Sequence, residues 1–144
     1  MPRATLDVDV IAGTSDAVAI HASAASAGLL VTEADAQMLA TSGMTRLRLP
    51  DHPRGAVRID VILALHPYYE RVIERARPVS LLGANVRVAS PEDLVLLKLL
   101  ADRAQDRADV EAILDAAGDS LDSELLAAEA SELELVLPER LRRT

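Results

Sequence analysis

The stretch TLDVDV, residues Thr5–Val10, alternates apolar and polar side chains near the start of the chain. This period of two predicts a half-buried β-strand. Because successive side chains of a strand point to opposite faces, Asp7 and Asp9 share one face and lie roughly 7 Å apart. Aspartate is depleted in strands, and two neighbouring carboxylates repel each other. A compensating partner is therefore expected beside this pair.

The composition predicts one domain, or one small domain with a helical appendage, in a chain of 144 residues. Half of the residues are hydrophobic, but Phe and Trp are absent and there are only two Tyr, so the core must be aliphatic. The absence of cysteine excludes disulfides, thiolate chemistry and cysteine zinc sites. The sequence has no run of about 18 apolar residues and no signal-peptide pattern, so we expect a cytoplasmic protein without a membrane partner.

Charge is unevenly distributed along the chain, whose net charge is −8. This overall acidity argues against nonspecific binding to nucleic acid or to anionic membranes. Residues 46–87 nevertheless contain eight Arg and four acidic residues, whereas residues 88–137 contain three basic and thirteen acidic residues. A ligand that carries phosphate is therefore expected at the middle third of the chain. The simpler interpretation is that these arginines are solvated on strand edges.

Periodicity and capping residues predict a strand-rich first part and a helical second part. We expect strands or a hairpin at Thr5–Val10, Arg46–Pro50, Ala56–Leu65 and on both sides of Gly83–Asn85, with a turn at Asp51–Gly55. Helices are expected at Asp16–Ala27, from His66, after the N-cap Ser90, at Asp106–Ala117 and at Leu121–Leu137, while Thr32–Gly43 fits either a helix or a loop.

This order predicts an α/β (α+β) class with a mixed β-sheet and C-terminal helices. Residues 1–89 would form the sheet core, and residues 90–144 a helical part packed on it as one structural unit.

Asp60 is the third acidic residue of interest, because it lies on the predicted strand VRIDVIL, opposite its apolar face. Beside Asp7 and Asp9 it would complete a set of three carboxylates, which suits a hard divalent cation. Mg²⁺ held in this way is typical of phosphoryl and nucleotidyl transfer. The alternative is that Asp60 faces solvent or pairs with Arg46 or Arg48 across the predicted hairpin.

Lys98 is the one polar residue within LVLLKLL, residues 94–100. A helix that is apolar all round is usually buried, so this lysine either extends its ammonium to the surface or points into a polar site. If the helix runs unbroken, Lys98 shares one face with Asp102, Asp106 and Asp109. Solvated ion pairs are the simpler account of that stripe.

Three segments together resemble a known family: RATLDVDV, VRIDVIL and VASPEDLVLLKLLADRAQDRADVEAIL. The resemblance is to the small nucleotidyltransferases of the DNA polymerase β superfamily, the group related to the abortive-infection AbiEii toxins. Their pattern has the form R-x-T-x-D-x-D, then a lone Asp on a later strand, then E-D-L-x-x-x-K-x-x-A-x-R-x-x-D. The resemblance covers most of residues 3–117. It is most specific in the last block, at Glu92, Asp93, Leu94, Lys98, Ala101, Arg103 and Asp106.

The resemblance implies a role for six residues. Asp7, Asp9 and Asp60 would be the catalytic carboxylates and would bind Mg²⁺ or Mn²⁺. Lys98, Arg103 and Asp106 would belong to the nucleotide site, with Lys98 on the phosphates.

The activity implied by the resemblance is metal-dependent transfer of a nucleotidyl group from an NTP to a hydroxyl. The acceptor would be RNA, a protein or a small molecule, and the protein would be toxin-like, as in a toxin–antitoxin pair.

The N-terminus departs from the family pattern. In the family a strand, a helix and a Gly-Gly or Gly-Ser pair precede the Asp-x-Asp strand, whereas here MPRAT alone precedes it. We therefore expect an exposed sheet edge and a homo-oligomer such as a dimer. The same departure, together with the acidic helix expected at Leu121–Leu137, supports the alternative of a catalytically inactive protein of this fold that acts as a binding or interaction module.

Overall fold

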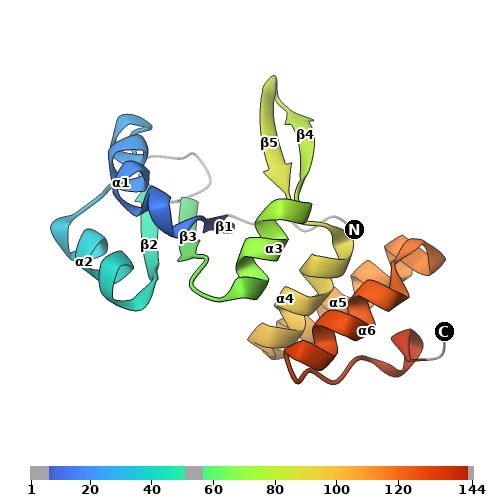
Figure 1. Ribbon diagram of the computed structural model, residues 1–144. Helices are drawn as coiled ribbons and strands as arrows, with labels where there is room; N and C mark the ends of the chain where they lie inside the picture. The colour runs from blue at the N-terminus through green and yellow to red at the C-terminus, as the bar shows by residue number, and fades with distance from the viewer. Residues whose placement is uncertain (1–6, 51–56, 143–144) are drawn as a thin grey trace. The chain divides into compact units, whose positions relative to one another are not determined.

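The computed structural model describes residues 7–50 and 57–142 and has an α+β fold, as the sequence predicts (Figure 1). The chain divides into two compact units, Met1–Ile73 and Glu74–Thr144. This division falls within helix α3 (Pro67–Arg75) and places the following hairpin in the same unit as the later helices. The division expected at residues 89 and 90 stays a prediction.

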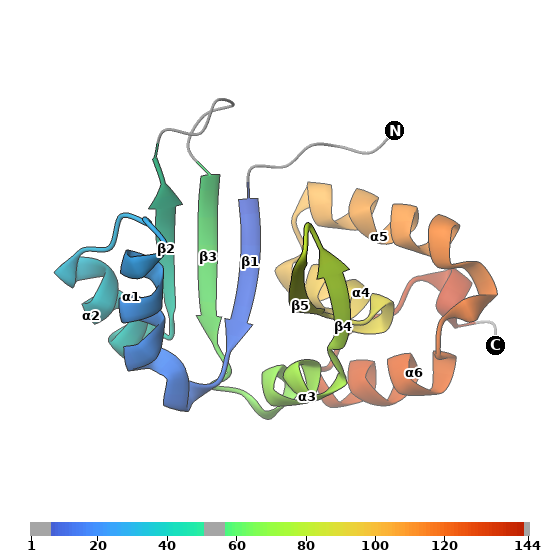
Figure 2. The ribbon, with the colours of Figure 1, turned by 90° about the horizontal axis from the view of Figure 1, so that it is seen from above.

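The first unit contains a three-stranded mixed sheet in the order β1-β3-β2 (Figure 2). Its strands are β1 (Asp7–Ala12), β2 (Met44–Leu49) and β3 (Val57–Leu63). β1 pairs with β3 in parallel, and β2 pairs with β3 antiparallel, which confirms the predicted pairing of these two segments. The predicted residues Thr5 and Leu6, the turn Asp51–Gly55 and Ala56 lie outside the described residues.

Two helices pack on one face of this sheet: α1 (Ala17–Ser26), which follows the 3₁₀ turn Thr14–Asp16, and α2 (Glu33–Ser42). α2 settles the segment that fitted either a helix or a loop, because Thr32 closes its N-terminus with a capping box. The Thr32 hydroxyl accepts a hydrogen bond from the Asp35 amide, and the Asp35 carboxylate accepts one from the Thr32 amide.

The core of the first unit lies between these helices and the sheet. Leu47, Val61 and Leu63 point from the strands to Leu39 of α2 and Ala24 of α1. The residues between them along the strands therefore point to the opposite face. The alternation predicted for β3 therefore gives this strand one buried apolar face and one face with polar side chains.

The second unit contains the hairpin β4 (Arg77–Leu81) and β5 (Ala84–Val88), followed by three helices. These are α4 (Pro91–Ala101), α5 (Ala104–Ala117) and α6 (Ser123–Glu132), with 3₁₀ turns at Gly118–Ser120 and Glu139–Leu141. α4 packs against both α5 and α6 through aliphatic residues: Val95, Leu96, Val110, Leu114, Leu126 and Ala130. Ser90 caps α4, as predicted.

The last helix is shorter than the sequence predicts. The amphipathic pattern indicated a helix to Leu137, but α6 ends at Glu132. Glu134 has a φ of 55°, and the Leu135 amide donates to the Ala130 carbonyl at 2.8 Å. Many helices end in this way, with a left-handed residue and a hydrogen bond from the following residue back to a carbonyl of the last turn. The apolar periodicity continues past that point, which is why it mispredicted the end.

Within the described ranges, no helix combines the length and the apolar character that crossing a membrane requires.

Candidate functional site

The exposed face of the three-stranded sheet carries two neighbouring rows of charged residues, which we call the charged sheet face. Strand register aligns Asp7 with Arg58 and Arg48 in one row, and Asp9 with Asp60 and Arg46 in the next. Aligned residues of neighbouring strands point to the same face and lie about 5 Å apart. The structure therefore brings the three predicted carboxylates to one face, and it interleaves them with arginines.

Two of these carboxylates are held by arginines through both oxygens. Arg46 donates to Asp60 from Nε at 2.6 Å and from Nη2 at 2.7 Å, and Arg58 donates to Asp7 at 2.6 and 3.0 Å. The hydrogen bonds to Asp60 raise the pKa of Arg46 above its ordinary value. The alternative in which Asp60 pairs across the hairpin is thus confirmed for Arg46. Arg58 is the partner of Asp7.

Asp9, the middle carboxylate, differs from its neighbours. Its side chain forms no salt bridge with any residue of the described ranges, although it aligns with Asp60. In the described part of the chain, no three His, Cys, Asp or Glu side chains are gathered tightly enough to hold a metal ion. The donor chemistry of Asp7, Asp9 and Asp60 still suits a hard cation. Gathering them would require Asp60 and Asp7 to turn away from their arginines.

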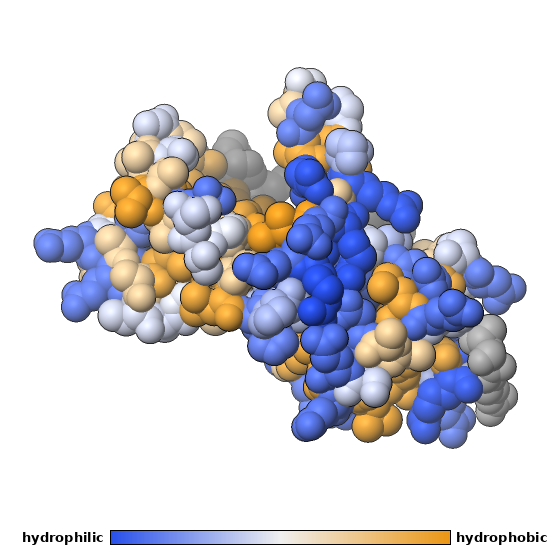
Figure 3. Space-filling model, viewed as in Figure 1, coloured by the Kyte–Doolittle hydropathy of each residue, from blue (hydrophilic) through white to orange (hydrophobic). Residues whose placement is uncertain are grey.

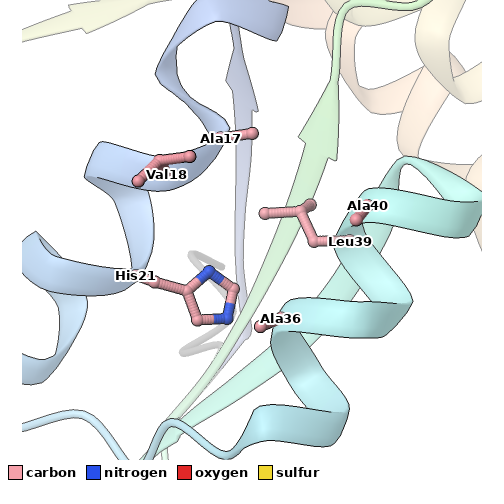
Figure 4. A pocket seen from close by; sticks show the side chains of 6 residues that line it. All are labelled: Ala17, Val18, His21, Ala36, Leu39 and Ala40. Carbon is pink, nitrogen blue, oxygen red and sulfur yellow. The ribbon is translucent and has the colours of Figure 1, made fainter.

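Two shallow cavities lie in the first unit. One, of about 240 Å³, flanks the Arg46–Asp60 pair and is lined by Met38, Ser42, Met44, Thr45, Arg46 and Asp60. The other, of about 310 Å³, is almost entirely apolar and lies between α1 and α2, where His21 points toward Ala36 (Figure 4). Nε2 of His21 is buried there without a hydrogen-bond partner among the described residues. The first cavity is the one next to the predicted carboxylates.

The other predicted site residues lie together in the second unit, around the junction of α4 and α5. Lys98 donates to Asp106 at 3.2 Å and to Asp109 at 3.0 Å, and these bonds raise the pKa of its ammonium despite the opposing effect of partial burial. The helix does not run unbroken, because Asp102 adopts a left-handed conformation with a φ of 46°. Asp102 consequently leaves the stripe and pairs with Arg107.

Asp106 is the centre of this cluster. Its carboxylate accepts hydrogen bonds from Nζ of Lys98 and from the backbone amide, Nε and Nη2 of Arg103, at 2.6 to 3.2 Å. The Arg103 guanidinium, with Lys98, outweighs burial and lowers the pKa of Asp106 to about 2. A carboxylate offers about four acceptor positions, so these donors account for the whole capacity of Asp106.

The motif residues before Lys98 also have partners inside the second unit. The buried carboxylate of Asp93 accepts from Arg75 at 2.6 and 3.0 Å, and Arg75 also donates to Glu129 at 2.7 Å. Glu92 accepts from the Asp122 amide at 3.0 Å. Glu92, Asp93, Lys98 and Asp106 therefore join α4 to neighbouring elements, and Arg103 pairs with Asp106 at the start of α5.

Sequence reasoning missed three residues of these ion pairs: Arg58, which binds Asp7, Arg75, which binds Asp93, and Glu129, which accepts from the same Arg75. Arg58 stands two residues before Asp60, so the alternation placed it on the charged sheet face, but the parallel register that aligns it with Asp7 cannot be read from the strand itself. Arg75 precedes Asp93 by 18 residues, and Glu129 follows Asp93 by 36 residues. No local sequence pattern connects these three positions.

Comparison with known proteins adds no relationship. No protein-family model matches the chain, and no curated protein matches its sequence.

Proposed function

We propose that this protein is a metal-dependent nucleotidyltransferase that moves a nucleotidyl group from an NTP to a hydroxyl acceptor. The observation that supports it most directly is the register of β1 and β3, which sets Asp9 beside Asp60 with Asp7 on the same face. The proposal places the reaction in the cytoplasm, in keeping with a chain that contains no cysteine.

The proposed reaction is an in-line displacement at the α-phosphorus of the NTP. The acceptor oxygen forms the new bond to phosphorus, the bond to the bridging oxygen breaks, and pyrophosphate leaves. A divalent cation bound at Asp7, Asp9 and Asp60 would neutralise the charge on the phosphate oxygens and polarise the phosphorus. The proton of the attacking hydroxyl would pass to Asp60 once Arg46 releases that carboxylate. Lys98 is the predicted phosphate ligand.

The experiment titrates the purified chain with each of ATP, CTP, GTP and UTP, with and without Mg²⁺, and measures binding by calorimetry. An Asp9→Asn variant is titrated in the same way for comparison. We expect one or more NTPs to bind only with Mg²⁺ present, and Asp9→Asn to abolish that dependence, because an amide binds a hard cation more weakly than a carboxylate. Asp9 is the suitable position, because its side chain holds no salt bridge in the described residues whose loss would confuse the result.

A second candidate is a catalytically inactive protein of the same fold that acts as an interaction module. The observation that favours it is the pairing of Asp60 and Asp7 with arginines, which neutralises two of the three carboxylates without any ligand. This candidate predicts that neither Mg²⁺ nor any of the four NTPs binds the chain. The same titration therefore distinguishes the two.

A further inference from the structure

The salt bridge between Arg46 and Asp60 stands where the proposed metal would have to bind. Both oxygens of Asp60 accept from the guanidinium, at 2.6 and 2.7 Å. A divalent cation on the same oxygens would lie a few ångströms from a fixed positive charge, and such like charges repel. Binding of the cation to Asp60 therefore opposes the retention of this salt bridge.

The salt bridge is also of a kind that a cation can displace. The Arg46 side chain is 56% exposed and that of Asp60 is 27% exposed. Ion pairs that are open to water contribute little to stability, because solvent screens the charges. The backbone of Arg46 is held in β2 by its register with β3, so its guanidinium can leave Asp60 while its Cα stays on the charged sheet face.

The released guanidinium would remain close to the proposed ligand. The cavity of about 240 Å³ lies against both residues and gives the side chain room to turn. A metal that bridges protein carboxylates and a nucleotide holds the phosphates within a few ångströms of those carboxylates. Arginine binds phosphate oxygens through two parallel N–H groups, the same geometry that it uses here toward Asp60.

We propose that Arg46 is an exchangeable counter-ion. In the free protein it neutralises Asp60; when a divalent cation takes Asp60, Arg46 turns to the phosphate groups of the nucleotide. This inference rests on the proposed function, because it assumes the metal site, and it adds a residue that positions the nucleotide. It also accounts for the position of one carboxylate in the free chain: Arg46 holds Asp60, as Arg58 holds Asp7.

The test separates the two halves of the exchange with one variant and one matched control. Arg46→Gln removes the guanidinium from Asp60. Arg48→Gln removes the same charge from the same face of the same strand, at a residue that forms no salt bridge within the described ranges. Both variants are checked by circular dichroism and compared with the unmodified chain. Mn²⁺ is the probe for the metal step, because its binding can be followed by electron paramagnetic resonance without nucleotide or turnover.

In the first arm Mn²⁺ alone is titrated into the three proteins. We expect Arg46→Gln to bind Mn²⁺ roughly tenfold more tightly than the unmodified chain. Arg48→Gln should change the affinity much less, because Arg46 contacts the predicted ligand Asp60 whereas Arg48 forms no salt bridge within the described ranges. Equal affinities for the two variants would overturn the competition at Asp60 while leaving the metal site in place. Absence of Mn²⁺ binding by all three proteins would overturn both this inference and the proposed function.

In the second arm the four NTPs are titrated at saturating Mg²⁺. We expect Arg46→Gln to lower the affinity of the protein for NTP by about tenfold, because a phosphate contact is lost. Arg48→Gln should lower this affinity less. Exchange therefore predicts that Arg46→Gln raises the affinity for Mn²⁺ and lowers the affinity for NTP. General damage to the charged sheet face would instead weaken the binding of both ligands. An Arg46→Gln variant that binds NTP as tightly as the unmodified chain would overturn the phosphate role.

Discussion

At the scale of single residues, Asp106 illustrates how the second unit handles a buried charge. Its side chain is 1% exposed, and four donors surround it, two of them from the side chain of Arg103. Burial alone would disfavour the charged form, but the hydrogen bonds more than reverse this effect. The price of removing a partner from such a group is high, since an unpaired buried charge remains.

The pH dependence of stability follows from this carboxylate. A pKa lowered in the folded state stabilises the fold above the unfolded pKa of 3.8 and loses that contribution as the pH falls toward about 2. We expect the free energy of unfolding to fall between pH 4 and pH 2, with about 2 kcal/mol due to Asp106. Urea titrations of the unmodified chain, Asp106→Asn and the exposed control Asp102→Asn measure this. Equal pH slopes for the unmodified chain and Asp106→Asn would contradict the assignment.

Lys98 carries a prediction with two separate readouts. Its side chain is 23% exposed and donates to Asp106 and Asp109, so Lys98→Met should lower the free energy of unfolding by about 1 to 3 kcal/mol. Lys98→Arg, which keeps the charge, should lower it less. If Lys98 is also a phosphate ligand, Lys98→Met should remove Mg²⁺-dependent NTP binding under conditions where circular dichroism shows the variant folded. Unchanged NTP affinity in the folded variant would leave Lys98 with its structural role alone.

At the scale of elements, the junction between α2 and β2 depends on one backbone conformation. Gly43 ends α2 with a φ of 72°, and its carbonyl accepts from the Leu63 amide at 2.7 Å, which links the helix end to β3. A Cβ atom at this position would lie 2.3 Å from Cδ1 of Leu65. Gly83, in the turn between β4 and β5, has a similar φ of 84° but no atom within 4 Å of such a Cβ.

Comparing alanine substitutions at these two glycines separates the destabilisation due to backbone strain from that due to steric overlap. Gly43→Ala should destabilise the fold by about 1 to 2 kcal/mol, because it adds the displacement of the exposed Leu65 side chain to the cost of a left-handed alanine. Gly83→Ala should cost about 1 kcal/mol, since it carries the conformational cost alone. Thermal unfolding of both variants tests the difference. A Gly83→Ala variant at least as destabilised as Gly43→Ala would show that the contact with Leu65 relaxes without cost.

At the scale of the whole molecule, apolar side chains reach the surface in both units (Figure 3). In the first unit Val8 and Val10 of β1 are exposed, and in the second unit the β4–β5 hairpin exposes Leu81 and Leu82, the latter completely. Large exposed apolar patches are uncommon in monomeric proteins and often mark association surfaces. The homo-oligomer expected from the sequence stays a prediction, and the hairpin is where it can be tested.

We expect the average mass measured by light scattering to rise with protein concentration. The double variant Leu81→Glu/Leu82→Glu should suppress this rise, because two charges on the hairpin resist desolvation. The double variant Ala127→Glu/Ala128→Glu adds the same charge to the exposed side of α6 and should leave the association unchanged. A monomeric mass for the unmodified chain at all concentrations would contradict the prediction.

The local elements of this protein are determined largely by the sequence itself. Alternation in TLDVDV and VRIDVIL predicted the two strands that carry the carboxylates, and Ser90 followed by proline and two acids predicted the start of α4. These signals are local, since they reflect side-chain periods of two residues and the unsatisfied amides of one helix turn. The convergence of Asp7, Asp9 and Asp60 on one face followed from the same alternation.

The partners of these charges were decided by the tertiary structure. Arg58 meets Asp7 only because β1 and β3 pair in parallel in one register, and a shift of one residue would have turned the carboxylates to the other face. Lys98 meets Asp106 and Asp109 because the chain reverses at Asp102, and Arg75 meets Asp93 and Glu129 because α4 packs on α6. Charge pairing depends on distances of a few ångströms across separate elements, and a linear pattern does not contain those distances.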